Sequence, residues 1–144
     1  MTPDQISLVK TSFDSVKPIS DDVAALFYGH LFEIAPEVRP LFSTDPKEQG
    51  RKLMAALNMV VSGLEKLEAI LPAVQAMALR HVDYGVTSDQ YAIVGEALIW
   101  ALSRALGPDF TAEVETAWLE AYTILANAMV AYAYPSEEDV AKAS

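Results

Sequence analysis

Two histidines, His30 and His81, carry the side chains of this sequence that are best suited to metal or acid–base chemistry. His81 comes three residues after Ala78 and four after Met77, so on a helix it shares their apolar face and points into the interior. His30 has a similar setting, with Phe27 three residues before it. A lone histidine on an apolar face is often a hydrogen-bonded core residue, and that interpretation stays open for both.

Other chemistries are excluded by what the chain lacks. It has no cysteine, which excludes disulfide scaffolds, thiolate zinc sites, iron–sulfur clusters and cysteine nucleophiles. The common nucleophile, phosphate-binding and calcium-loop motifs are also absent. Two histidines cannot form a tight zinc site without carboxylates, but one imidazole is sufficient as the axial ligand of a haem. Apolar residues make up 52% of the chain, a surplus that a large apolar group such as haem would need around it.

The length and the charge set further limits on the function. A chain of 144 residues is one ordinary domain. Its 20 acidic and 10 basic residues give a net charge of −10, which argues against nucleic acid or an anionic membrane as the main partner. The first twenty residues lack a basic start followed by an apolar run, and no apolar stretch reaches the roughly 18 to 20 residues of a spanning helix. We therefore expect a cytoplasmic protein without membrane insertion.

The spacing of the apolar residues predicts six main helices, with a short helical turn near residues 36–42. The helices are expected over residues 3–17, 20–34, 46–64, 72–84, 88–106 and 112–134. Thr2 with Gln5 and Thr87 with Gln90 are spaced as capping boxes, and Thr111 is placed to cap the last helix. Segments of alternating polarity are absent, so the predicted fold class is all-α.

Proline and glycine positions set the expected helix boundaries. Pro72 is expected to begin the fourth helix, Gly85 to end it, and Pro135 to end the last helix. We expect one domain over residues 1–134, followed by a flexible acidic tail over residues 135–144.

Five segments, taken in order and spacing, resemble bacterial single-domain globins of the Vitreoscilla haemoglobin type and the globin module of flavohaemoglobins. The segments are Leu26–Phe32, Pro36–Phe42, Arg80–Val86, Tyr91–Glu96 and Ala117–Tyr122. The resemblance covers residues 1–133 and implies a globin fold, in which three helices cross over three others and hold haem b between them.

The resemblance also implies roles for individual residues. His81 would be the proximal iron ligand, with its second ring nitrogen donating to a backbone carbonyl one turn earlier. Tyr28 would be the distal tyrosine that donates a hydrogen bond to the bound gas, with Gln49 as a second donor and Leu53 facing the ligand. Phe42 would stack on the porphyrin. A core tyrosine whose hydroxyl is tied to the backbone remains the alternative for Tyr28.

Further positions follow from the same resemblance. The residues implied to pack on the porphyrin are Leu57, Val86, Tyr91, Val94 and Leu98. Tyr91 would also sit against His81, although plain structural packing is equally compatible with it. Arg51, Lys52 and Arg80 are candidate partners for the haem propionates, or ordinary surface cations. His30 would then be a core or interhelical histidine.

The function that the resemblance implies is reversible binding of dioxygen at a five-coordinate ferrous iron, for oxygen storage, delivery, transport or buffering. Nitric oxide and carbon monoxide are the other expected ligands. The alternative is an enzyme, a nitric oxide dioxygenase that is reduced by a reductase in trans. Ala133 stands where flavohaemoglobins carry a proximal glutamate, which favours the first function. A haem-free interaction module is a remote third alternative, and the sequence makes no prediction for the oligomeric state.

Overall fold

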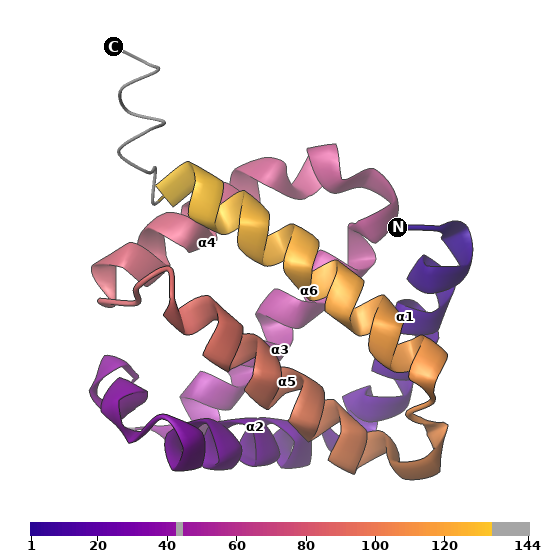
Figure 1. The fold of residues 1–144 in the computed structure, drawn as a ribbon, viewed down its shortest axis with the longest axis horizontal. Coiled ribbons are helices and arrows are strands. Elements are labelled where there is room, and N and C mark those ends of the chain that lie inside the picture. Colours follow the sequence, from indigo (N-terminus) through magenta and orange to yellow (C-terminus); the bar gives the residue numbers. More distant parts are fainter. Residues whose placement is uncertain (43–44, 134–144) are drawn as a thin grey trace.

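Six α-helices and four short 3₁₀-helices make up the regular structure of residues 1–42 and 45–133, the part of the chain that the computed structural model describes (Figure 1). The α-helices are α1 (Pro3–Val16), α2 (Ser20–Ile34), α3 (Pro46–Ser62), α4 (Leu67–Asp83), α5 (Gln90–Leu106) and α6 (Ala112–Ala133). The 3₁₀-helices are η1 (Lys17–Ile19), η2 (Pro36–Leu41), η3 (Leu64–Lys66) and η4 (Gly107–Asp109). The all-α prediction is confirmed. The predicted tail over residues 135–144 lies outside the described residues.

The starts of α1 and α6 follow the predicted capping signals. The box at α1 is complete, because Thr2 N–H donates to Gln5 Oε1 at 3.0 Å and Gln5 N–H donates to Thr2 Oγ1 at 3.1 Å. At α6, Thr111 Oγ1 accepts from the N–H of Val114 at 3.2 Å. At α5 the helix begins at Gln90, later than predicted, and Thr87 N–H donates to Gln90 Oε1 at 2.9 Å as one half of the expected box.

The predicted start of α4 at Pro72 is wrong. The helix begins at Leu67, and Pro72 lies inside its second turn. Proline in a helix removes one backbone hydrogen bond, here the one to the carbonyl of Glu68. Because residues 67–69 and 71–73 are exposed, water can donate a hydrogen bond to that carbonyl, and the helix continues through the proline.

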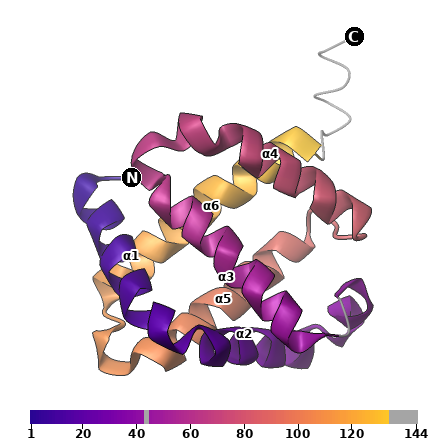
Figure 2. The same cartoon turned by 180° about the vertical axis from the view of Figure 1, so that it is seen from behind.

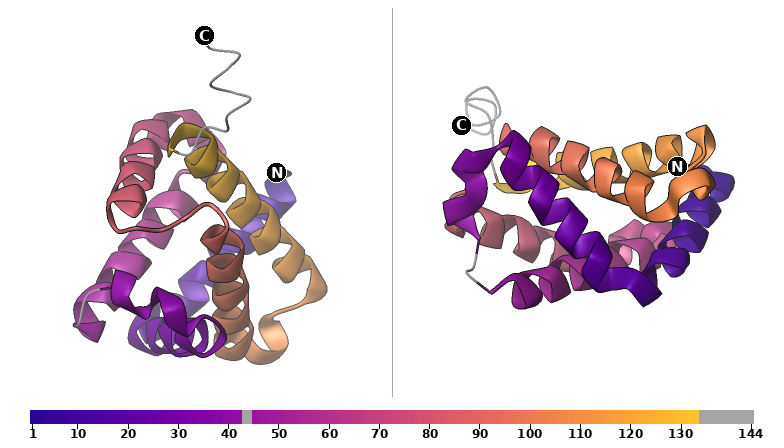
Figure 3. Two further views of the ribbon diagram at one scale, coloured as in Figure 1. Left: turned by 60° about the vertical axis from the view of Figure 1, so that its left-hand side comes forward. Right: turned by 90° about the horizontal axis from the view of Figure 1, so that it is seen from below.

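The helices pack as two pairs with α2 across one end. Seen from below, α5 and α6 lie on one side and α3 and α4 on the other (Figure 3). Helix α2 contacts both α3 and α5, and α1 and α4 both contact α6. In the reverse view, α3 lies in front and crosses α5 and α6 (Figure 2).

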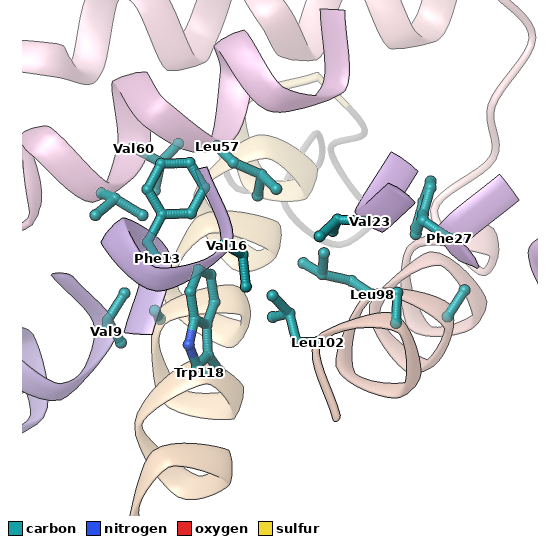
Figure 4. Packing of buried hydrophobic residues seen from close by; sticks show 14 of the residues in the cluster. Val9, Phe13, Val16, Val23, Phe27, Leu57, Val60, Leu98, Leu102 and Trp118 are labelled. Atoms are coloured by element: carbon teal, nitrogen blue, oxygen red, sulfur yellow. The ribbon is translucent and has the colours of Figure 1, made fainter. Parts of the chain in front are cut away.

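The interior is divided into a main core and a smaller cluster. The main core joins α1, α2, α3, α5 and α6 around fully buried side chains such as Phe13, Leu31 and Leu102 (Figure 4). Trp118 Nε1 donates to Ser12 Oγ at 2.9 Å within it. The smaller cluster consists of Val74, Met77, Ala78, Tyr91 and Met129. His81 lies next to this second cluster, because Nδ1 of His81 bonds to the Met77 carbonyl and its ring neighbours that of Tyr91.

None of the described helices combines the length and the apolarity needed to cross a lipid bilayer.

Candidate functional site

His81 lies in the last turn of α4, half-buried, with one of its two ring nitrogens engaged. Its Nδ1 is 2.7 Å from the carbonyl oxygen of Met77, one turn earlier, as predicted. A carbonyl can only accept, so Nδ1 carries the proton and the lone pair of the neutral ring is on Nε2. Burial lowers the pKa of His81 below its ordinary value and Arg80 acts in the same direction, whereas the bond to Met77 opposes them. The ring is therefore held as a neutral imidazole with Nε2 as its electron-pair donor.

A pair of tyrosines supports His81 from α5 and α6. The ring of Tyr91, buried at the start of α5, lies 6.1 Å from the ring of His81. The hydroxyl of Tyr122 donates to the backbone carbonyl of Tyr91 at 2.6 Å, and burial raises the pKa of Tyr122. Gly95 allows this contact, because a Cβ there would lie only 2.5 Å from Cε2 of Tyr122. Tyr122 had no predicted role, and the signal for it in the sequence was Gly95, an isolated glycine inside a helix.

Helix α4 ends at Asp83, two residues after His81, and the chain then turns toward η2. Gly85 has φ +89°, the left-handed conformation that ends a helix, as predicted. The N–H of Val86 donates to the carbonyl of His81 at 3.0 Å across this turn. A Cβ at Gly85 would lie 3.3 Å from Cδ2 of Leu41, in η2. The turn therefore brings the segment after His81 against the segment that precedes Phe42.

Tyr28, in α2, stands in an aromatic group with Phe32 and Phe42. The ring of Tyr28 is 5.4 Å from that of Phe42 and 6.0 Å from that of Phe32, and the two phenylalanine rings are 5.5 Å apart. Burial raises the pKa of Tyr28 to about 12, so its hydroxyl keeps its proton near neutrality. The structure brings Tyr28 and Phe42 together, and it adds Phe32, which had no assigned role.

Gln49 meets Tyr28 through its backbone. The hydroxyl of Tyr28 donates to the carbonyl oxygen of Gln49 at 3.2 Å. This is the backbone-tied alternative for Tyr28, but the distance exceeds the 2.5 to 3.0 Å usual for a hydroxyl donor. Helices α2 and α3 approach closely beside it, because a Cβ at the buried Gly50 would lie 3.0 Å from Cβ of Ala24.

The predicted porphyrin-packing residues fall in both apolar clusters. Leu57 and Leu98 are buried in the main core, while Leu53 and Val94 are half-buried against it. Val86 packs on the smaller cluster beside Tyr91. Leu53 and Leu57 come from α3, Val94 and Leu98 from α5, and Val86 from the turn after α4.

The other predicted positions lie at the surface or away from His81. Arg51, Lys52 and Arg80 are exposed, and Lys52 Nζ is 3.7 Å from a carboxylate oxygen of Glu48. The ring of His30 stacks on Trp100 at 4.1 Å and 5°, linking α2 to α5 as an interhelical histidine.

Two further observations bear on the kind of ligand that the site can hold. No group of three or more histidine or carboxylate side chains in residues 1–42 and 45–133 is arranged to hold a bare metal ion. Ala133 is half-buried and packs against the smaller cluster. Nε2 of His81 is a single nitrogen ligand beside the apolar smaller cluster. These residues fit an apolar group that brings its own metal, such as haem.

Comparisons with known proteins agree with this arrangement. The sequence model of the globin family matches residues 25–129. The chain is 32% identical to a flavohemoprotein of Oceanobacillus iheyensis over 126 residues and 31% identical to one of Bacillus thuringiensis over 140 residues. These alignments cover 85% and 94% of the chain but only 31% and 34% of the relatives, so the chain spans about a third of their length.

Solved structures of similar shape cover nearly the whole chain. An engineered carbene transferase, derived from a provisionally assigned nitric oxide dioxygenase of Rhodothermus marinus, matches with a TM-score of 0.84 at 30% identity, over 100% of this chain and 99% of that one. A bacterial globin from Campylobacter jejuni matches with a TM-score of 0.83 at 30% identity, over 92% of this chain and 96% of that one.

Proposed function

This chain belongs to the globin family, and from that premise we propose that it holds haem b and reversibly binds dioxygen, for oxygen storage, delivery or buffering. The observation that carries the proposal is the hydrogen bond from His81 Nδ1 to the carbonyl of Met77. This bond fixes the ring and leaves the lone pair of Nε2 available for a metal. When bound, haem would supply a five-coordinate ferrous iron with one open position for dioxygen, nitric oxide or carbon monoxide.

The proximal role belongs to His81 in this proposal. A neutral imidazole is the form that binds iron, and burial favours that form. The bond to Met77 fixes the ring orientation, so less conformational entropy is lost on coordination. Tyr91 limits ring rotation from the other side, at 6.1 Å between the ring centres.

The distal role belongs to Tyr28. Its hydroxyl remains protonated, and its 3.2 Å bond to the carbonyl of Gln49 is long enough to be exchanged at small cost for a bond to a gas ligand. A buried donor gains strength from the low dielectric when the acceptor carries negative charge. The side-chain amide of Gln49 would be a second donor, and Leu53 would limit the room around the gas.

The remaining contacts of the cofactor follow from the positions already described. Phe42 would lie against the porphyrin plane, and the other packing residues would be Leu57, Val86, Val94 and Leu98. Arg51, Lys52 and Arg80 are exposed cations that would pair with the propionates.

A nitric oxide dioxygenase is the second candidate, and the name of the similar Rhodothermus marinus protein favours it. Tyr28 and Gln49 would serve that reaction as well as oxygen binding. Its turnover would require an electron donor, which we assign to a reductase in trans. Ala133 speaks against this candidate, since without a carboxylate there His81 has less imidazolate character and donates less electron density.

Absorbance spectra of the ferric, ferrous and oxygenated forms test the proposal. We expect a Soret band and a reversible oxygen spectrum in the native protein, and loss of both in His81→Ala. His30→Ala is the matched control, because His30 stacks on Trp100 instead, and it should keep both spectra. A spectrum unchanged by His81→Ala would contradict the assignment, and native protein that takes up no haem would support the haem-free alternative.

Consumption of nitric oxide with a reductase present separates the two candidates. Slow nitrate formation at saturating donor favours oxygen binding. Fast formation that Tyr28→Phe abolishes would favour the dioxygenase.

A further inference from the structure

A groove runs along the outer face of the molecule between α5 and α6, and its lining includes Tyr91, Gly95 and Tyr122 of the site described above. The two helices converge toward η4 and spread apart toward their other ends (Figures 1 and 3). The groove has a volume of about 660 Å³. Its lining spans residues 91–99 of α5 and 115–130 of α6, which corresponds to roughly 12 Å and 22 Å of helix. It is therefore long enough to hold two to four turns of another helix.

The floor of the groove is apolar and fixed. Tyr122 lies in it, wedged against Gly95 and bonded to the carbonyl of Tyr91. Ile99 and Val130 are half-buried in the lining. Leu119 contributes the largest uncovered apolar surface, at 47% exposure. A hollow between two helices that combines apolar side chains with a few polar groups is a common setting for a binding site.

The rim of the groove is acidic. Glu96 on α5 and Glu115 on α6 are its two exposed carboxylates, and no lysine or arginine is among the lining residues. Helix α6 carries no lysine or arginine over Ala112–Ala133. The single cation of α5, Arg104, lies over the ring of Trp100, which stacks on His30 of α2, and so faces the other side of the helix.

We propose that this groove is the docking site for a partner protein that presents a basic amphipathic helix. Apolar side chains of that helix would enter between Leu119 and Ile99, and its lysine or arginine side chains would face Glu96 and Glu115. Helix-in-groove binding uses this combination of an apolar stripe and charged flanks. A second copy of the chain is disfavoured as the occupant, since two faces of the same negative sign repel.

The position of the groove gives the partner access to the proximal side. The hydroxyl of Tyr122 reaches the backbone of Tyr91, and the ring of Tyr91 neighbours that of His81. A helix that contacts Tyr122 is thus connected to His81 through two residues, Tyr122 and Tyr91. The docking surface itself depends only on α5 and α6, so it stands whether or not haem is bound.

The test uses the full chain and a defined probe. The probe is a fluorescein-labelled 18-residue helical peptide with leucine on one face and lysine on the rest, titrated by fluorescence anisotropy at low salt. We expect saturable binding that weakens as salt is raised. The variant Glu96→Lys with Glu115→Lys should weaken it at least tenfold, and Leu119→Gln should weaken it severalfold.

The control makes the same change of charge elsewhere. Glu33→Lys with Glu68→Lys alters two exposed acids on α2 and α4 and should change the affinity less than twofold. Circular dichroism checks that every variant folds. Equal losses in the two double variants, or no saturable binding, would overturn the proposal. So would a native dimer in sedimentation that Glu96→Lys dissociates, because that result assigns the groove to a second copy.

Discussion

The two sides of the candidate haem site are built with different tightness. On the proximal side, His81 bonds to the Met77 carbonyl at 2.7 Å and Tyr122 bonds to the Tyr91 carbonyl at 2.6 Å. On the distal side, Tyr28 makes one bond of 3.2 Å. Burial raises the pKa of both tyrosines, so the two sides differ in bond length and packing rather than in ionisation. We infer that the fold fixes the ring of His81 and leaves the hydroxyl of Tyr28 adjustable.

The backbone explains this difference. The proximal histidine bonds within its own helix, at a separation of four residues, where helix geometry sets the distance. The distal bond joins Tyr28 in α2 to Gln49 near the start of α3, two residues that are 21 positions apart in the sequence. The position of Tyr28 therefore depends on how closely two helices approach, and the aromatic contacts around it tolerate small shifts.

The largest effect is expected where the proximal packing is tightest. Gly95→Ala places a Cβ 2.5 Å from the ring of Tyr122 and should lower the free energy of unfolding by about 2 kcal/mol, measured by urea denaturation. Gly29→Ala is the matched control beside Tyr28, because nothing lies within 4 Å of its Cβ position. It should stabilise the protein by roughly 0.5 to 1 kcal/mol, as alanine does inside helices. Equal effects would contradict the difference in tightness.

The next largest effect concerns the distal hydroxyl. In the haem-bound protein, Tyr28→Phe should speed dioxygen dissociation roughly tenfold, because a hydrogen bond to a charged acceptor is lost. Its free energy of unfolding should change by less than about 0.5 kcal/mol, since the bond removed is long. Stopped-flow dissociation and urea denaturation measure the two. A large loss of stability with unchanged dissociation would make Tyr28 a core tyrosine only.

The proximal tyrosine should show the opposite pattern. Tyr122→Phe removes the short bond to Tyr91 and should cost about 1 kcal/mol of stability. Because Tyr122 bonds to Tyr91 on the proposed proximal side, dioxygen dissociation should stay within about twofold of the native rate. A dissociation rate changed as much as in Tyr28→Phe would remove the distinction between the two sides.

The smallest effect is a dependence on pH. The folded chain holds the pKa of His81 below its ordinary value, so between those two pKa values the unfolded chain binds more protons. The contribution of His81 to stability is therefore complete above the ordinary pKa and falls as the pH drops through it. His81→Gln should show a smaller loss of stability from pH 7.5 to 5 in parallel denaturation series. An equal loss in both proteins would assign the acid sensitivity to other groups.

Local signals in the sequence were enough for much of this architecture. The capping box at Thr2, the cap at Thr111 and the glycine stop at Gly85 each depend on residues within one turn. The bond from His81 to Met77 is equally local. The predicted start of α4 was wrong because the helix continues through Pro72. Whether a helix can do so depends on the exposure of its backbone, which local sequence does not give.

Contacts between distant segments were less accessible. Tyr122 and Tyr91 are 31 residues apart, and their bond depends on how α5 crosses α6. The bond from Tyr28 to Gln49 was foreseen only as a backbone acceptor of unspecified position. The groove between α5 and α6 could not be read from periodicity, because its apolar and acidic residues come from two helices.

The proline inside α4 also implies that the two ends of that helix open with different ease. No side chain caps its first turn, residues 67–69 and 71–73 are exposed, and Pro72 has no amide hydrogen to donate. Opening should therefore begin at Leu67, while the turn that carries His81 is held by Met77 and the stop at Gly85. Hydrogen–deuterium exchange should follow this gradient, with rapid exchange before Pro72 and strong protection from Met77 to His81. We therefore expect helix α4 to fray at the end far from His81, and the turn that carries His81 to be among the last parts of the helix to open.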